Sequence, residues 1–228
     1  MDAAGSWRFL GGPDSWTYRL LDAQRKRLNR RLVRYLASYI SAGKGSHVLE
    51  GGSGPGFASS LFAGEPGVGL SVALDKDLAA LREGRRRDPG LPAVRADVYR
   101  LPFRSGTFDL VWNSSTLEHL EASREALAEM RRVTKEGGWV FIGVPYRCGP
   151  LGFQPWIKRT AFGAWIGPVF DRATLIRMVS EHGLIPLTVT TYFFHCFIGI
   201  VARKSAERLQ PEAAQRDTES PCALAPAR

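Results

Sequence analysis

The pattern of apolar positions changes along the chain, from a helical period near the amino terminus to short apolar runs separated by helical stretches. Between residues 14 and 40, apolar residues recur every three or four positions with arginines between them, which predicts an amphipathic leading helix, or two. The short apolar runs typical of buried strands are residues 47–50, 68–74, 93–96, 107–113 and 139–145. Helical patterns lie between most of them, at residues 57–62, 77–87 and 122–133. Strands that alternate with helices predict an α/β fold built on a parallel sheet.

The alternation breaks down after residue 145. Residues 146–170 are rich in glycine, proline and aromatic residues. An insertion of this length is more often functional than idle, so we interpret it as a lid or a substrate wall; a local mini-core over the sheet is the alternative. A helix over 171–182 and two strands at 187–193 and 196–204 are expected to follow.

The pattern divides the chain into three parts. Residues 1–45 form a helical cap, residues 46–204 form one α/β domain, and residues 205–228 are nearly free of aromatics, which is typical of a disordered tail. A length of 228 residues suits a single domain, and 44% hydrophobic with 23% charged residues is typical of a soluble globular protein. The apolar stretch near 192–202 is too short to span a bilayer. No signal-peptide pattern is present, so we expect a cytoplasmic protein.

The cysteines, the histidines and the net charge limit which metal sites, disulfides and partners the chain can have. The three cysteines are far apart and the four histidines form no metal spacing, so we expect neither a disulfide framework nor a metal site. The net charge is +9, and residues 1–46 hold nine basic and three acidic residues. A basic leading helix can attract nucleic acid, anionic lipid or an acidic small substrate, although a solvated helix face is the simpler explanation of the charge.

A glycine-rich loop, VLEGGSGPGFAS at residues 48–59, joins the first predicted strand to the next helix. Glycine at alternate positions, in Gly52, Gly54 and Gly56, lets the backbone turn with positive φ and lie against a ligand. Glu50 would repel a phosphate and favour a cationic sulfonium or ammonium group. The dinucleotide fingerprint also fails, because its last glycine position holds Phe57.

The spacing E-x-G-x-G-x-G after a strand resembles the first motif of the class I S-adenosylmethionine-dependent methyltransferases, in particular the broad ubiquinone/menaquinone-methyltransferase-like group. A second resemblance is the F-D-L-V strand at 108–111 followed by a small-residue turn and E-H-L. The resemblance implies a Rossmann-like three-layer sandwich with a seven-stranded, mostly parallel sheet whose last strand is antiparallel. It also implies S-adenosyl-L-methionine as cofactor and S-adenosyl-L-homocysteine as product.

Acidic residues at strand ends complete the predicted cofactor site. Asp75 ends the second strand, where a carboxylate can accept hydrogen bonds from both ribose hydroxyls. In the resembled family an acid at the position of Asp97 binds the adenine amino group, and the residues after it, here Val98 and Tyr99, pack along the ring. The full expected cofactor set is Glu50, Gly52, Gly54, Gly56, Asp75, Lys76, Asp97, Val98 and Asn113.

The expected acceptor is a small molecule, apolar or aromatic, and the methylated atom can be oxygen, nitrogen or carbon. Asn113 is followed by Ser-Ser-Thr and not by the Pro-Pro-aromatic motif of base-amine methyltransferases, and the Pro-Cys pair of cytosine-C5 enzymes is missing, which argues against nucleic acid. His119 is the candidate base, since it titrates near neutral pH. The expected acceptor-binding residues are Tyr18, Tyr146, Trp156 and Trp165.

Two other functions fit parts of the sequence. A non-catalytic module could keep the cofactor fold and bind an RNA, lipid or protein partner, and an oxidoreductase could use a nicotinamide cofactor. The failed dinucleotide fingerprint argues against the second. We also expect peripheral contact of the leading helix with anionic lipid, and either a monomer or a homodimer.

Overall fold

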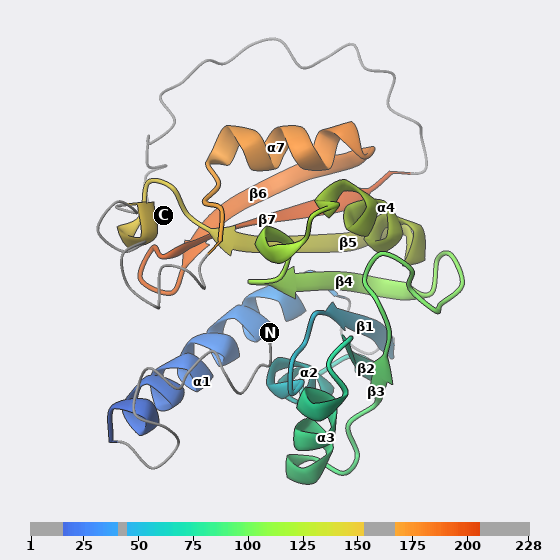
Figure 1. The fold of residues 1–228 in the computed structure, drawn as a ribbon. Helices are drawn as coiled ribbons and strands as arrows, with labels where there is room; N and C mark the ends of the chain where they lie inside the picture. Colours follow the sequence, from blue (N-terminus) through green and yellow to red (C-terminus); the bar gives the residue numbers. More distant parts are fainter. Residues whose placement is uncertain (1–15, 41–44, 153–166, 206–228) are drawn as a thin grey trace.

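The computed structural model describes residues 16–40, 45–152 and 167–205, and its centre is one seven-stranded sheet (Figure 1). The strands are β1 (Ser46–Gly51), β2 (Val68–Asp75), β3 (Ala93–Arg95), β4 (Phe108–Ser114), β5 (Thr134–Pro145), β6 (Leu184–Tyr192) and β7 (Phe197–Lys204). Their order in the sheet is β3-β2-β1-β4-β5-β7-β6. Strands β1 to β5 pair in parallel, whereas β7 is antiparallel to both of its neighbours, β5 and β6. The expected sheet, with its antiparallel last strand, is therefore confirmed.

The helices begin and end close to the predicted residues. They are α1 (Trp16–Ala37), α2 (Phe57–Ala63), α3 (Leu78–Arg87), α4 (Ser123–Val133) and α7 (Arg172–Glu181), with short 3-10 turns η2 (Leu117–His119) and η3 (Pro150–Gly152). Two aspartates cap their helices. Asp77 accepts hydrogen bonds from the backbone N–H groups of Ala79 and Ala80, and Asp171 accepts one from Thr174. None of the described helices is both long and apolar enough to cross a lipid bilayer.

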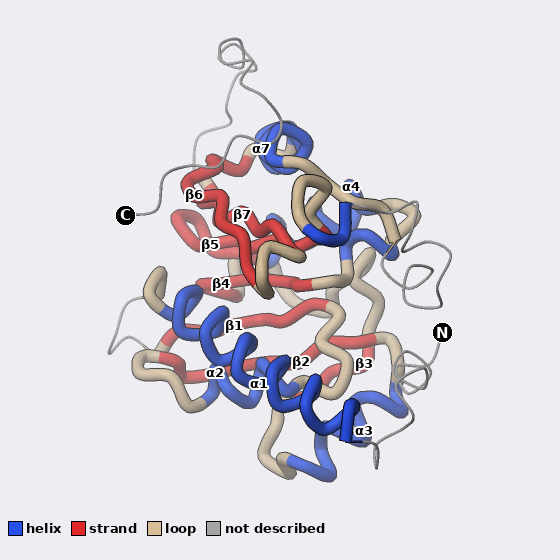
Figure 2. Tube along the Cα trace, turned by 90° about the vertical axis from the view of Figure 1, so that its left-hand side faces the viewer, coloured by secondary structure: helices blue, strands red, loops and turns tan. Residues whose placement is uncertain are grey.

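Each face of the sheet has its own apolar core, which gives three layers (Figure 2). We call these the α1 core and the α4 core. The α1 core consists of Leu32, Val33, Leu36, Ile40, Val48, Ala58, Phe62, Leu110, Trp112, Phe141 and Val201. The α4 core covers the other face with buried residues of α4 and α7, including Leu127, Met130, Leu175 and Val179. Successive residues of a strand point to opposite faces, so Leu110 and Trp112 of β4 enter the α1 core while Val111 enters the α4 core.

Three elements differ from the sequence prediction: β5, α1 and β6, which begins at Leu184 and not at residue 187. The segment expected to be a turn at Gly137 and Gly138 belongs to β5, which begins at Thr134 and shifts register against β4 between Phe108 and Leu110. Gly137 has φ +72°, a conformation that suits such an irregularity in a strand. Helix α1 ends at Ala37, before the predicted end.

The expectation of no disulfide is wrong for one cysteine. Cys148, which follows β5, is disulfide-bonded, whereas Cys196 is a free thiol. The wide spacing of the three cysteines hid this pairing, because sequence separation does not limit which thiols meet in a fold.

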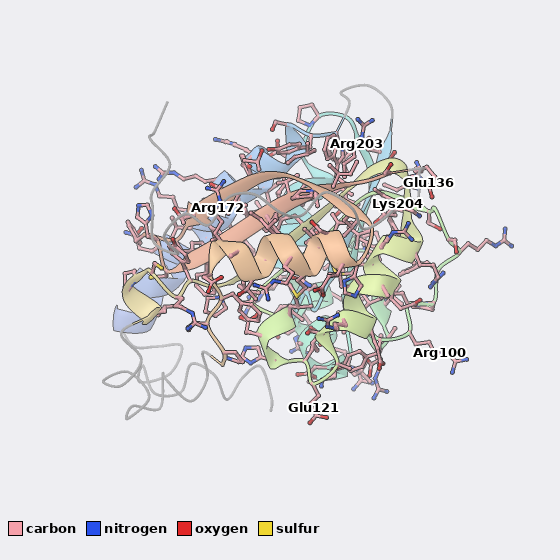
Figure 3. All side chains as sticks on the ribbon, turned by 90° about the horizontal axis from the view of Figure 1, so that it is seen from above. Arg100, Glu121, Glu136, Arg172, Arg203 and Lys204 are labelled. Atoms are coloured by element: carbon pink, nitrogen blue, oxygen red, sulfur yellow. The ribbon has the colours of Figure 1, made fainter. Side chains whose placement is uncertain are left out.

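The amino-terminal end of β5 is held by ion pairs that lie away from the predicted site (Figure 3). The Lys204 ammonium lies 3.1 Å from a carboxylate oxygen of Glu136 and donates a hydrogen bond of 2.8 Å to the Thr134 carbonyl. These contacts fasten β7 to β5 at the end of the sheet opposite to the carboxyl ends of the parallel strands. All the predicted cofactor residues lie at or near those carboxyl ends.

Candidate functional site

The loop between β1 and α2 turns sharply because three of its glycines are left-handed. Gly52, Gly54 and Gly56 have φ of +72°, +54° and +70°. The N–H groups of Gly52 and Ser53 both donate to the carbonyl of Leu74 at the end of β2, at 2.8 and 3.0 Å. A Cβ at Gly52 would lie 2.3 Å from the Thr116 side chain, while one at Gly54 would meet nothing within 4 Å. The loop is thus packed on one side and open at Gly54.

Asp75 connects this loop to the end of β2. One of its carboxylate oxygens accepts a hydrogen bond of 2.7 Å from the Gly54 N–H, and the other accepts one of 2.8 Å from the Asp77 N–H. An ionised carboxylate has about four lone-pair sites, so each oxygen keeps capacity for another donor. Asp75 therefore holds the loop and can still accept hydrogen bonds from two hydroxyl groups. Lys76, which follows it, is exposed to solvent.

Glu50 is buried below the loop, with 8% of its surface exposed. The Ser59 hydroxyl, on the first turn of α2, donates to a Glu50 carboxylate oxygen at 2.5 Å. A carboxylate next to the first turn of a helix is favoured by the helix dipole. Glu50 thus places a negative group under the loop, where an anionic phosphate would be repelled.

Asp97 and Val98 lie at the end of β3, next to the same loop. Asp97 is exposed and accepts a 3.0 Å hydrogen bond from the Tyr99 N–H, while the side chain of Val98 lies 3.7 Å from the position a Cβ would take at Gly51. Helix α4 fixes the chain that follows. Its Glu129 accepts from the Leu101 N–H at 2.8 Å, and its Arg132 donates to the carbonyls of Leu101 and Phe103.

The turn after β4 contacts the glycine loop directly. Ser115 has φ +58°, a left-handed conformation that is rare for a residue with a side chain, and such residues concentrate at functional sites. The Thr116 hydroxyl donates to the Gly52 carbonyl at 3.3 Å. Asn113, in contrast, is 3% exposed and its amide nitrogen lies 3.4 Å from the Met130 sulfur on α4, so its side chain points into the α4 core.

Glu118 and His119 follow in η2. The Glu118 side chain is 1% exposed and the His119 side chain 39%, and the Glu118 Oε1 atom lies 3.9 Å from the His119 Nε2 atom. Burial raises the pKa of Glu118 from 4.5 to about 8, although its own backbone N–H favours the ionised form. Burial also lowers the pKa of His119, so this imidazole is neutral near pH 7 and can accept a proton.

The expected acceptor residues are only partly within the described structure. Tyr146 is 5% exposed at the end of β5, where it pairs with Phe170 and joins the two ends of the insertion. Trp156 and Trp165 lie outside the described residues. Tyr18 lies on α1, but its side chain is outside the described part, as are residues 1–15 of the cap and the tail from residue 206.

The site fits a cofactor with a sugar and a cationic group. A glycine loop open at Gly54, two carboxylates at the ends of β2 and β3 and a buried acid at the end of β1 lie at one edge of the sheet. Carboxylates accept hydrogen bonds from ribose hydroxyls and from an amino group, and they favour a nearby positive charge. This arrangement of hydrogen-bond acceptors and negative charge suits S-adenosylmethionine better than a pyrophosphate.

Sequence reasoning missed three residues of this region. Ser59 was not expected to bond Glu50, and Thr116 was not expected to contact Gly52. Glu118 was not expected to be a buried acid, and only its neighbour His119 was a candidate base. A charged residue between the apolar Leu117 and Leu120 was the available signal for a buried acid.

Known proteins resemble this chain in sequence. Residues 49–142 match a family model described as a methyltransferase domain. The demethylmenaquinone methyltransferase of Renibacterium salmoninarum is 38% identical over 109 residues, which cover 48% of this chain and 45% of that protein. The malonyl-[acyl-carrier protein] O-methyltransferase of Enterobacter lignolyticus is 32% identical over 116 residues, or 50% of this chain and 45% of that protein. The chain thus spans about half the length of the curated relatives it matches.

Solved structures share the fold at low identity. The geranyl diphosphate C-methyltransferase from Streptomyces coelicolor A3(2), in complex with Mg²⁺, geranyl diphosphate and S-adenosyl-L-homocysteine, has a TM-score of 0.64 at 18% identity and covers 86% of each chain. A SAM-dependent methyltransferase from Aquifex aeolicus has a TM-score of 0.60 at 16% identity, with 78% of this chain and 93% of that chain covered. At these identities the likeness concerns the fold.

Proposed function

We propose that the chain is a class I, S-adenosylmethionine-dependent methyltransferase that transfers a methyl group to a small-molecule acceptor, since residues 49–142 match a methyltransferase domain. The observation that carries this proposal is the Asp75 carboxylate, which braces the glycine loop through the Gly54 N–H and keeps acceptor capacity for a ribose. A loop and a strand end fixed to each other in this way are ready to bind the nucleoside without large rearrangement.

Each residue of the site would bind a different part of S-adenosylmethionine. Asp75 would accept hydrogen bonds from the ribose, Asp97 would accept one from the adenine amino group, and Val98 would contact the ring. Glu50 would favour the cationic tail through its charge below the loop. When bound, S-adenosylmethionine supplies a methyl group that its sulfonium makes electrophilic. The protein's share is to align the acceptor and exclude water, and alignment alone can lower a barrier by about 7–11 kcal/mol.

We further propose that the acceptor has an apolar or aromatic body. The relatives named above act, by their names, on demethylmenaquinone and malonyl-[acyl-carrier protein], which supports a small-molecule or carrier-bound acceptor. The aromatic insertion at 146–170 supports an apolar or aromatic body. His119 would take a proton from the acceptor where the reaction releases one.

The direct test measures cofactor binding and turnover on the full-length chain. Calorimetry with S-adenosyl-L-homocysteine should show one site per chain, and labelled S-adenosylmethionine incubated with quinols, acyl thioesters and prenyl diphosphates should give one methylated product class. Tight cofactor binding without product from any class would favour a binding module. Absence of cofactor binding would refute the proposal.

The insertion can be tested separately because its two ends are already joined. Arg147 donates its N–H to the Phe170 carbonyl at 2.8 Å, and Phe170 donates to the Pro145 carbonyl at 2.8 Å. Replacing residues 153–166 by a short glycine linker should therefore preserve the thermal midpoint and cofactor affinity. Acceptor turnover should be lost. Full turnover by the shortened protein would show that the segment is not a substrate wall.

We also propose peripheral contact with anionic lipid through α1. Arg27, Arg30, Arg31 and Arg34 are exposed on this helix, while Leu32, Val33 and Leu36 face the sheet. Binding to phosphatidylserine vesicles should weaken steeply as salt rises, and neutral vesicles should not bind. Glutamine at Arg30 and Arg34 should reduce the binding, and equal binding by the variant would contradict this contact.

A further inference from the structure

Glu118 combines deep burial with an unused hydrogen-bonding atom. Its side chain is 1% exposed, and within the described part of the chain its Oε2 atom has no hydrogen-bond partner. Buried carboxyl groups are nearly always paired, since leaving one unpaired costs free energy. The unpaired Oε2 atom of Glu118 therefore needs an explanation. The position of Glu118 supports one explanation, in which a bound ligand supplies the missing hydrogen-bond partner.

Glu118 lies between the cofactor loop and the end of the insertion. On one side, Thr116 of the same turn contacts Gly52 of the loop. On the other side, a Cβ at Gly167 would lie 3.4 Å from both the Glu118 Cγ atom and the His119 Nδ1 atom. The carboxyl ends of β4 and β5 are therefore next to this acid, which is where an acceptor would approach the cofactor.

A second polar group faces the same region from β6. The Tyr192 hydroxyl lies 2.8 Å from the Ser114 hydroxyl at the end of β4. A Cβ at Gly143 of β5 would lie 2.0 Å from the Tyr192 oxygen, so glycine is required there for the hydroxyl to come this close. The Glu118 charge is near enough to raise the pKa of Tyr192, whose main cause of elevation is burial.

We infer that Glu118, with the Ser114–Tyr192 pair, binds an oxygen atom of the acceptor, so that the acceptor carries a hydroxyl or carbonyl group beside the methylated position. The inference rests on the proposed methyl transfer and makes its substrate class narrower. A carboxylic acid group has one O–H donor and one carbonyl acceptor, which match a hydroxyl or carbonyl oxygen. Tyr192 and Ser114 each offer a hydroxyl that can donate or accept.

The protonation of the surrounding groups agrees with a neutral oxygen ligand. Burial raises the pKa of Glu118 to about 8, so it is mostly protonated near pH 7. The titratable groups that the described structure places against it are His119 of its own turn, with a lowered pKa, and Tyr192 of β6, with a raised one. All three are therefore neutral near pH 7, which is unfavourable for a cationic ligand.

The test measures binding of a probe to the full chain saturated with S-adenosyl-L-homocysteine. The probes are 1-naphthol and naphthalene, which differ by one hydroxyl, and the variants are Glu118→Gln, Glu118→Leu and Tyr192→Phe. Glu121→Leu is the matched control, because Glu121 follows in the same connection and is exposed (Figure 3). Affinity for S-adenosyl-L-homocysteine is measured in parallel on every variant.

We expect the wild type to bind 1-naphthol at least tenfold more tightly than naphthalene. Glu118→Leu should lose that tenfold preference, Glu118→Gln should stay within about threefold because its amide also donates and accepts, and Tyr192→Phe should lose part of it. Infrared difference spectra of wild type minus Glu118→Gln should show a protonated carboxyl band that shifts with 1-naphthol.

Three results would overturn the inference. They are equal binding of both probes by the wild type, an unchanged preference in Glu118→Leu, and an ionised carboxylate band for Glu118 at pH 7. Should Glu118→Leu fail to fold, Tyr192→Phe and the infrared spectra still decide, since neither of them needs the leucine variant. If one of these results occurs while the wild type binds S-adenosyl-L-homocysteine, only this inference fails. If the wild type does not bind S-adenosyl-L-homocysteine, the proposed function is refuted.

Discussion

Three acids near the carboxyl ends of the strands differ in how their oxygens are hydrogen-bonded. Glu50 accepts from the Ser59 hydroxyl, and both oxygens of Asp75 accept from backbone N–H groups. Glu118 keeps one buried oxygen without a partner among the described residues. Partners within the fold hold a carboxylate in place, while spare capacity allows it to bind a ligand. Asp75 is held by the fold and can also bind a ligand, while Glu118 has a buried oxygen whose hydrogen-bonding capacity is unused.

Substitution of Asp75 should weaken cofactor binding strongly. Asp75→Ala removes two expected bonds to the ribose and the brace on Gly54, and bonds to charged groups contribute about 1.5–3 kcal/mol each, so affinity for S-adenosyl-L-homocysteine should fall at least tenfold. Asp75→Asn should lie between this variant and the wild type. Calorimetry measures the effect, with Asp88→Ala, at the end of α3, as control. Equal affinities of wild type and Asp75→Ala would remove the ribose assignment.

Glu118 should make the stability of the protein depend on pH. Its pKa is raised from 4.5 to about 8, so above pH 4.5 the unfolded chain releases a proton that the folded chain retains. The contribution of this group to the free energy of unfolding is therefore fully present below pH 4.5. It is lost as the pH rises through 8, by about 1.4 kcal/mol per pH unit between these values. Glutamine at position 118 does not titrate, so the variant Glu118→Gln lacks this pH dependence.

The stability of Glu118→Gln relative to wild type should therefore rise between pH 5 and pH 8. Urea unfolding at four pH values in this range measures the difference. His119 and Tyr192 are present in both proteins, so their own titrations largely cancel. Parallel curves for the two proteins would show that Glu118 is already ionised in the folded state.

Local spacing in the sequence can indicate which residues lie side by side, while their binding roles stay predictions. Asp75 and Gly54 stand at fixed distances from the strands that place them, and the structure joins them by a hydrogen bond. Glu118 could not be recognised in this way, because its environment includes Tyr192, 74 positions later in the chain. Asn113 was expected at the cofactor, but its side chain points toward Met130, since alternation along β4 sends it to the α4 face.

At the level of elements, the loop between β1 and α2 depends on different properties of two glycines. Gly52 and Gly54 both have positive φ, but only at Gly52 would a Cβ meet another side chain, that of Thr116. A left-handed conformation costs a residue with a side chain about 1–2 kcal/mol. Gly54→Ala should therefore destabilise the protein by about 1 kcal/mol, whereas Gly52→Ala should cost clearly more, on the order of 3 kcal/mol, through added overlap.

Urea unfolding of the two alanine variants measures this difference. Cofactor affinity should fall in both, since Gly52→Ala displaces the loop and Gly54→Ala places a methyl group on its open side. Thr116→Ser provides the control for Gly52→Ala, because it removes the methyl group nearest to the new Cβ and should recover part of the lost stability in the double variant. Equal costs at the two positions would show that backbone conformation alone matters.

Most strands and helices could be predicted because each has a clear period and clear ends. The cap residues Asp77 and Asp171 stand directly before helical patterns, and the structure begins α3 and α7 there. The start of β5 could not be predicted, because the irregular pairing around Gly137 depends on β4 as a partner and not on the local sequence. The same limit applies to Cys148, whose disulfide depends on the fold.

At the scale of the whole molecule, the central strands belong to both cores at once. Leu49 and Val111 enter the α4 core, while their neighbours Val48 and Leu110 enter the α1 core. Removing the helix from one face would therefore disturb strands on which the other face depends. We expect the two cores to unfold as one cooperative unit.

Large-to-small substitutions on opposite faces test this cooperativity. Leu36 of α1 and Leu175 of α7 are both fully buried, and truncation to alanine at such sites costs about 2–5 kcal/mol. Each variant should shift one and the same unfolding transition, followed by far-ultraviolet circular dichroism and by tryptophan fluorescence.

Because the two side chains lie on opposite faces of the sheet, their effects should add within about 0.5 kcal/mol in the double variant. Leu187→Ala, at a position 51% exposed, should change stability little. If Leu36→Ala instead separated the two signals into two transitions, α1 and its core would be an independent unit, and the leading helix could open over the cofactor site without unfolding the sheet.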